Sequence, residues 1–161
     1  MGEGLTAGVI TVSDRCHAGE MEDRSGPAVA AMLRKAGFEA GQPEVVPDER
    51  EMIADAIRAA QERGCALIVT TGGTGLSPRD VTPQATISVV DYEVPGLAEQ
   101  MRRAGLSSTP MSMISRATAG VRKDSLVLNL PGSERGARES LAAVTPALHH
   151  AVRLLRGEKA H

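Results

Sequence analysis

The chain has 161 residues, 42% of them hydrophobic, and a formal net charge of −2, which suits one soluble domain and provides no basic surface for DNA or RNA. Phe38 and Tyr92 are its only aromatic residues, which argues against base stacking on single-stranded nucleic acid. The two cysteines form no CxxC pair, and no apolar run approaches the ~20 residues that cross a bilayer. We therefore expect a cytoplasmic protein that binds neither nucleic acid nor membrane.

Predicted strands and helices alternate along the chain. Apolar runs predict strands over residues 5–13, 45–46, 66–71 and 126–130. Apolar residues at helical spacing predict helices over 25–37, 48–64, 82–92, 95–104 and 137–155, the last restarting at Pro146. The segment 109–122 has poor periodicity and is expected to be a loop with room for one short strand. This alternation predicts a single three-layer α/β domain over residues 1–161, with a largely parallel sheet.

A glycine-rich loop follows the strand predicted over 66–71. Gly72, Gly73, Thr74 and Gly75 come directly after this apolar run. Glycines let the backbone approach a ligand closely, with N–H groups free to point at an anion, and open α/β sheets bind ligands beyond the carboxyl ends of their strands. The loop lacks the Gly-Lys-Ser/Thr of a P-loop and the helix of a dinucleotide fingerprint. By itself it is either a phosphate cradle or a tight turn that needs positive φ.

Other strand-end segments are expected at the same edge of the sheet. They are Ser13-Asp14-Arg15, Pro47-Asp48-Glu49 and Pro131-Gly132-Ser133. Their convergence with the glycine loop is a stronger signal for a site than any one of them. Ser13 and Asp14 are also compatible with a strand-end turn whose side chains bind nearby backbone N–H groups. Arg15, Arg79, Arg116 and Arg135 are either surface charges or contacts for an anionic substrate.

Two aspartates stand beside the predicted cradle. Asp48, with Glu51 three residues on, is compatible with a helix N-cap as well as with a catalytic role. Asp80 precedes Thr82-Pro83, which already supply a capping residue and a proline at the first helical position, so Asp80 is free for another role. Two carboxylates near a phosphate cradle are what Mg²⁺ requires, since it completes its shell with phosphate and water.

Motifs distributed over nearly the whole chain resemble one family. They are Thr70–Gly75, Arg79–Pro83, Thr11–Asp14, Asp23–Pro27, Val46–Glu49, Glu93–Gly96, Ser115–Gly120 and Leu130–Ser133. They follow one another along the chain in the order of the family they resemble, the molybdopterin adenylyltransferases of molybdenum-cofactor biosynthesis, which include the equivalent domains of gephyrin and its plant counterpart. The resemblance implies the molybdopterin-binding fold, a homotrimer, and transfer of AMP from Mg-ATP to the molybdopterin phosphate with release of pyrophosphate. It also implies hand-over of the product to a separate metal insertase.

The resemblance assigns roles to individual positions. Asp48 and Asp80 match the critical carboxylates, expected to be catalytic and to hold Mg²⁺. The nucleotide and its phosphates are expected at Gly72, Gly73, Thr74, Gly75, Pro131 and Gly132. Molybdopterin is expected at Ser13, Asp14, Ser115, Arg116 and Ser133.

Two positions depart from the family pattern. Gln84 replaces a common acidic residue, on what should be a helix surface, and Glu134 replaces a common proline, where an acid would weaken binding of an anion. The main alternative is a catalytically weak paralogue that binds or carries molybdopterin without turnover. The Arg79–Pro83 string and the presence of both aspartates favour the active type. An unrelated nucleotide-binding regulator would bind ATP without dependence on a pterin.

Overall fold

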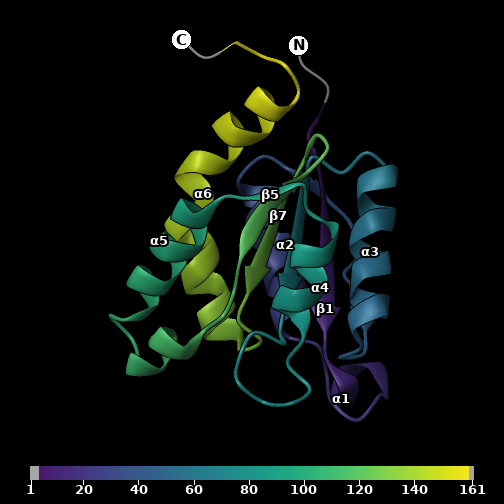
Figure 1. Ribbon diagram of the computed structural model, residues 1–161, viewed down its shortest axis with the longest axis vertical. Coiled ribbons are helices and arrows are strands. Elements are labelled where there is room, and N and C mark those ends of the chain that lie inside the picture. The colour runs from purple at the N-terminus through teal and green to yellow at the C-terminus, as the bar shows by residue number, and fades with distance from the viewer. Residues whose placement is uncertain (1–3, 160–161) are drawn as a thin grey trace.

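The computed structural model describes residues 4–159 as one sheet between two layers of helices (Figure 1). The elements are β1 (Thr6–Val12), α1 (Asp14–His17), α2 (Ser25–Lys35), β2 (Glu39–Ala40), β3 (Glu44–Val46), α3 (Arg50–Glu62), β4 (Leu67–Thr71), α4 (Thr82–Val89), β5 (Tyr92–Glu93), α5 (Pro95–Gly105), the 3-10 helix η1 (Pro110–Ile114), β6 (Ala119–Arg122), β7 (Ser125–Leu130) and α6 (Glu134–Leu155). Residues 1–3 and 160–161 of the predicted domain lie outside the described part.

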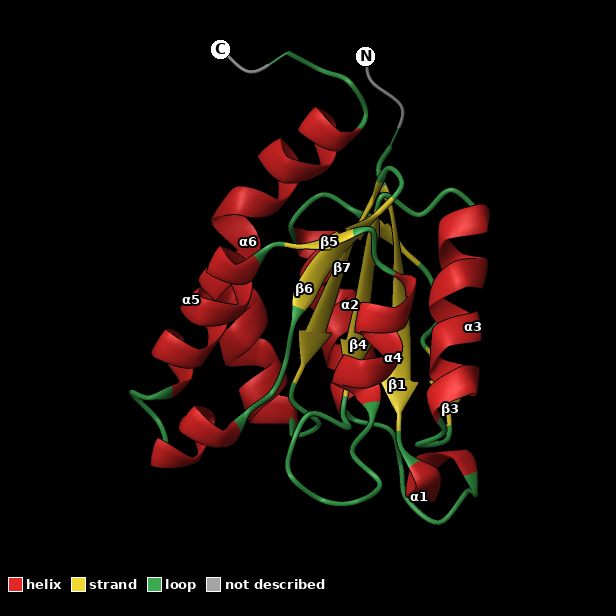
Figure 2. Ribbon diagram, in the orientation of Figure 1, coloured by secondary structure: helices red, strands yellow, loops and turns green. Residues whose placement is uncertain are grey.

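The sheet is mostly parallel. Its order is β2-β1-β4-β7-β6-β5, and β3 pairs with β1 beyond the end of β2. The neighbours β1, β4 and β7 run parallel, whereas β6 and β5 are antiparallel additions at one edge. In Figure 2 the arrowheads of β1, β4 and β7 point to the same edge of the sheet, so the loops that follow them meet there. The predicted α/β fold with a largely parallel sheet is confirmed.

Both faces of the sheet are buried. One core joins α2, α5 and α6 to the side of the sheet that presents Val9, Val69 and Leu128. The other joins α3 and α4 to the opposite side, where Ile10 and Ile68 point. Apolar residues therefore follow one another along β1 and β4 without alternation, as expected for strands covered by helices on both faces. In the described residues no helix has both the length and the apolar character that crossing a membrane requires.

Three sequence-based predictions differ in detail from the structure. The one short strand allowed for within 109–122 is present as β6, although the 3-10 helix η1 there was not predicted, and the predicted helix 82–92 ends at Val89 so that Tyr92 and Glu93 form β5. The strands β5 and β6 are short; β6 pairs with β7 and β5 pairs with β6, so both depend on strand pairing rather than on a local pattern. Pro146 does not restart a helix, because α6 is continuous over Glu134–Leu155 with this proline inside it.

Candidate active site

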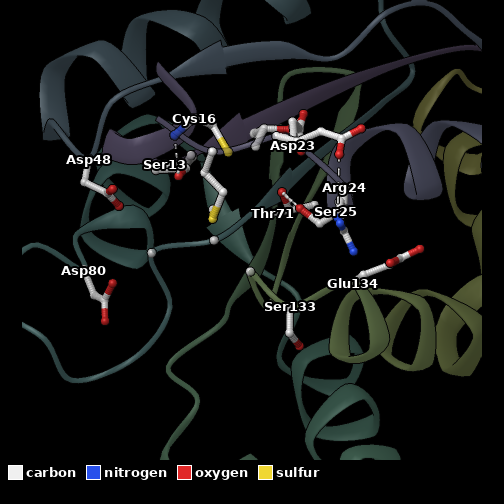
Figure 3. A pocket seen from close by; sticks show the side chains of 17 residues that line it. Ser13, Cys16, Asp23, Arg24, Ser25, Asp48, Thr71, Asp80, Ser133 and Glu134 are labelled. Carbon is white, nitrogen blue, oxygen red and sulfur yellow. Dashed lines mark hydrogen bonds and ion pairs between the residues drawn. The ribbon is translucent and has the colours of Figure 1, made fainter. Parts of the chain in front are cut away.

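A cavity of about 680 Å³ opens at the carboxyl ends of β1, β4 and β7 (Figure 3). Its walls come from segments far apart in the sequence: 11–13 and Cys16 at the end of β1, 21–25 at the start of α2, Asp48 after β3, 71–73 and Asp80 at and after the end of β4, and 132–134 after β7. Figure 3 places Asp48 and Asp80 on one side of the cavity, with Arg24 and Glu134 on the other. The predicted convergence of strand-end loops is therefore present in the structure.

Gly72 and Gly73 have the positive φ values, 96° and 70°, that the turn interpretation required. The Gly72 N–H donates to the Leu130 carbonyl at 3.0 Å, so this group is engaged in the fold. A Cβ on Gly72 would collide with the carbonyl oxygen of Val12. Within residues 4–159, by contrast, the N–H groups of Gly73 and Thr74 donate no hydrogen bond. The loop is thus a tight turn that requires glycine and also presents backbone donors, and the two interpretations are compatible.

Asp48 is not a helix cap. The N-cap of α3 is Glu49, and the Asp48 carboxylate instead accepts a hydrogen bond from the Asp14 N–H at 2.9 Å. Burial raises the pKa of Asp48, and the neighbouring carboxylates of Asp14 and Asp80 act in the same direction. A half-buried carboxylate at a cavity wall, held by one hydrogen bond, keeps lone pairs available for a ligand.

Asp80 also makes no capping bond, although the predicted reason was wrong. Thr82 is not the cap of α4; Val81 occupies that position, and the Thr82 hydroxyl donates to the Gly72 carbonyl at 2.8 Å. The Asp80 carboxylate accepts from the Ser77 N–H at 3.1 Å, which shapes the turn between β4 and α4. Asp80 is nevertheless one of the residues that line the main cavity, on the same side as Asp48 (Figure 3).

The two aspartates form a small donor set for a cation. No cluster of three or more His, Cys, Asp or Glu side chains suited to a metal occurs among residues 4–159. A hard cation at Asp48 and Asp80 would therefore take its remaining ligands from phosphate and water, which is how Mg²⁺ is usually held in phosphate-binding sites. The residues present fit that ion.

Asp14 lies beside the cavity rather than in its wall. Its carboxylate accepts from the Asp48 N–H at 3.0 Å and pairs with both Nε and Nη2 of Arg79, at 3.0 and 2.9 Å. The hydrogen bonds from Arg79 hold the pKa of Asp14 below its usual range. Arg79 reaches Glu49 as well, at 3.0 Å. The contact of Asp14 with substrate stays a prediction, and the contacts that its carboxylate makes in the structure are with Asp48 and Arg79.

The three predicted substrate serines are divided between two cavities. Ser13 lines the main one, and Ser115 lines a second cavity of about 240 Å³ together with Thr74 and Pro131. Ser133 lines both. Ser13 and Ser133 also cap α1 and α6, accepting from the backbone N–H three residues on at 3.1 Å in each case. Each hydroxyl oxygen accepts the capping hydrogen bond, so its O–H group is still available to donate a hydrogen bond to a ligand.

Arg116 supports the glycine loop from outside both cavities. Its guanidinium donates to the carbonyls of Gly75 and Asp80 at 2.9 and 2.7 Å and to the Gln84 side chain at 3.1 Å. Gln84 is exposed on α4, as expected. Arg116 N–H donates in addition to the Thr74 carbonyl. Of the other predicted arginines, Arg135 pairs with Glu139 and Arg15 is exposed outside the two cavities.

Sequence reasoning missed polar residues at the base of the main cavity. The Thr11 hydroxyl donates to Asp23 at 2.7 Å, and the Ser25 and Thr71 hydroxyls are 2.9 Å apart. Asp23 also accepts from the Gly26 N–H, which fixes the start of α2. The motif Asp23–Pro27 is part of the family resemblance, but nothing in its spacing indicates that it faces the glycine loop.

Comparisons with known proteins place the chain in a family. Residues 8–150 match the model of the probable molybdopterin binding domain. The chain is 42% identical over 143 residues to a molybdopterin adenylyltransferase of Haemophilus influenzae, covering 87% of this chain and 73% of that protein. It is 44% identical over 154 residues to a molybdenum cofactor biosynthesis bifunctional protein of Synechococcus elongatus, covering 96% of this chain but only 48% of that protein.

A solved structure is similar over almost its whole length. The molybdopterin biosynthesis enzyme MoaB of Thermus thermophilus superposes with a TM-score of 0.89 at 51% identity, covering 96% of this chain and 98% of that one. The fold, the strand-end cavity and the sequence similarity agree. The chain belongs to the family of the probable molybdopterin binding domain.

Proposed function

We propose that this chain is a molybdopterin adenylyltransferase, which transfers AMP from ATP to the phosphate of molybdopterin and releases pyrophosphate. The observation that carries the proposal is the presence of Asp48 and Asp80 in one cavity with the Gly72-Gly73 turn. The Haemophilus influenzae relative of that name, 42% identical over 143 residues, supports it.

The proposed reaction requires positioning more than proton transfer. The phosphate of molybdopterin is already anionic at neutral pH, so its oxygen attacks the α-phosphorus of ATP without a general base. The bond from the α-phosphorus to the bridging oxygen breaks, and pyrophosphate leaves with that oxygen. Alignment of the reactants and neutralisation of charge supply the acceleration in such transfers. The N–H groups of Gly73 and Thr74 are suitable donors to phosphate oxygens.

Asp48 and Asp80 are the residues that would hold Mg²⁺, which supplies charge neutralisation on the triphosphate when bound. We assign the nucleotide to the main cavity, because the aspartates and the glycine turn lie there. Since Ser133 lines both cavities, an acceptor in the second cavity would meet the nucleotide at this residue.

The trimer, the cytoplasmic location and the hand-over to a metal insertase belong to the same proposal. Exposed apolar side chains at the end of α5 and on η1 provide a surface for contact between copies; they are Leu106, Met111, Met113 and Ile114. Light scattering should give three times the chain mass of 16.8 kDa. Exposed apolar clusters of this kind are typical of protein contacts.

The test is an assay of the purified protein with molybdopterin, ATP and Mg²⁺. We expect pyrophosphate and adenylylated molybdopterin in equal amounts, with loss of both in Asp48→Asn and Asp80→Asn. Asp55→Asn, which changes an exposed aspartate of α3, is the matched control and should keep the wild-type rate. Near wild-type rates in both site variants would overturn the assignment of the two aspartates. Binding of molybdopterin without pyrophosphate would instead support the weakly active paralogue.

A further inference from the structure

Arg79 connects three strand-end loops that are separate in the sequence. It lies in the loop after β4, next to Asp80, and its guanidinium grips both carboxylate oxygens of Asp14 after β1, at 3.0 and 2.9 Å. The same guanidinium is 3.0 Å from Glu49, in the loop after β3. One side chain therefore ties the segment carrying Asp80 to the segments carrying Asp14 and Asp48.

Asp14 passes this connection on to Asp48. The Asp14 carboxylate accepts the Asp48 N–H at 3.0 Å, and the Asp48 carboxylate accepts the Asp14 N–H at 2.9 Å. The backbone and the carboxylate of Asp48 are thus both held by Asp14. A displacement of Asp14 would move the Asp48 carboxylate directly, because nothing else among the described residues donates a hydrogen bond to it.

The loop after β4 is supported differently on its other side. There Arg116 donates to the backbone carbonyls of Gly75 and Asp80. Leu76, Ser77 and Pro78 are exposed between these two supports. The loop is therefore held on the β6 side by the hydrogen bonds from Arg116 to its backbone carbonyls, and on the β1 side by the Arg79–Asp14 ion pair.

Arg79 itself is not placed to bind a substrate. It is absent from the walls of both cavities, and its charge is already met by two carboxylates. We propose that Arg79 is a positioning residue, whose bidentate pair with Asp14 sets the distance between the Asp48 and Asp80 carboxylates on their side of the main cavity. The inference rests on the proposed function for its catalytic consequence, and the geometry it describes can be tested without catalysis.

The planar guanidinium group of arginine, with two parallel N–H donors, is essential to this role. Two parallel N–H donors match a carboxylate in a fixed orientation, whereas a lysine ammonium holds it as a point charge. We therefore expect Arg79→Lys to fail to rescue the function of Arg79. The pair is partly exposed, with 54% and 41% of the two side chains accessible, so its loss should change global stability little.

Kinetics of AMP transfer distinguish positioning from substrate contact. Arg79→Gln and Asp14→Asn should each lower kcat by about 10- to 100-fold, the effect of a misplacement near 1 Å, with KM for ATP changed by less than about threefold. The double variant should be no slower than the slower single variant, because both changes break the same pair. Arg58→Gln, which breaks an exposed Arg–Asp pair on α3, is the control and should behave as wild type.

Amide hydrogen exchange, measured without ligand, tests the geometry independently of activity. The amides of Asp14 and Asp48 should exchange about tenfold faster in Arg79→Gln than in wild type or Arg58→Gln, at an unchanged melting temperature. Unchanged exchange at both amides would overturn the proposal. The proposal would also be overturned if the rate losses of the two single variants multiplied in the double variant. It would be overturned, too, if Arg79→Lys restored activity and the defect of Arg79→Gln lay in KM for ATP, because Arg79 would then be a direct phosphate ligand. A wild type without AMP transfer would refute the proposed function, and exchange would then decide on Arg79.

Discussion

Asp14 and Asp48 donate their backbone N–H groups to each other's carboxylates, at 2.9 and 3.0 Å, although 34 positions separate them in the chain. This reciprocal pair joins the end of β1 to the start of α3 beside the main cavity. The two carboxylates have opposite environments: Arg79 holds the pKa of Asp14 low, whereas burial raises the pKa of Asp48. Asp14 is therefore the structural member of the pair, and Asp48 is the member left available to a ligand.

Asp48→Asn should lose AMP transfer while gaining stability at neutral pH. The folded chain binds the Asp48 proton more tightly than the unfolded chain, because the pKa is raised above the usual 3.8. The contribution of the protonated Asp48 side chain to the free energy of unfolding is therefore complete below pH 3.8, and it is lost as the pH rises through the raised pKa. Without metal, the variant should melt at a higher temperature than wild type at pH 7, and the difference should vanish towards pH 3.8. We expect transfer to fall by about 100-fold. A variant less stable than wild type at pH 7 would contradict this account.

Gly72→Ala should destabilise the fold and distort the glycine turn. Positive φ at a non-glycine residue costs about 1–3 kcal/mol, and the new methyl group would also press on the Val12 carbonyl. Urea unfolding should therefore show a loss of at least ~2 kcal/mol. The matched control is Gly41→Ala, where a Cβ meets nothing within 4 Å and the backbone has no positive φ. Equal stability of the two variants would show that the turn tolerates a side chain.

Thr82→Val should weaken the support under the same turn. The buried Thr82 hydroxyl donates to the Gly72 carbonyl, and valine keeps the shape while removing the donor. Leaving a buried acceptor unpaired costs about 1–3 kcal/mol, which denaturant titration would detect. Thr145→Val is the control, since that hydroxyl donates within α6 to Leu141 and is only half-buried. A smaller loss in Thr82→Val than in Thr145→Val would refute the supporting role.

Glu134→Gln should improve binding of ATP. The Glu134 carboxylate lines the main cavity, where it repels an anionic ligand, and its ion pair with Arg138 at 3.1 Å offsets only part of that charge. We expect the dissociation constant of ATP to fall about two- to fivefold, equivalent to up to ~1 kcal/mol, and the gain to shrink as salt is added. Calorimetric titration measures both. Glu62→Gln, at an exposed position of α3, should leave binding unchanged.

Local signals were sufficient to predict the framework of the site. Buried apolar runs bounded by turn residues identified β1, β4 and β7, and parallel strands bring the segments that follow them to one edge. The positive φ of Gly72 and the placement of Asp48 and Asp80 in one cavity follow from that arrangement. By contrast, β5 and β6 have no strong pattern of their own; β6 forms because β7 offers an edge for pairing, and β5 pairs in turn with β6.

The sequence by itself therefore determined which loops meet, since periodicity and chain direction are local properties. Only the tertiary structure decided what each side chain in those loops does. Arg79 grips Asp14, Arg116 holds the glycine loop, and Thr82 supports Gly72 instead of capping α4. Each of these contacts joins residues from different segments of the chain. Each forms only if the donor and the acceptor atoms are placed to within a few tenths of an ångström. Sequence spacing carries no information at that scale, because hydrogen bonds are set by the packing of the elements that bear them.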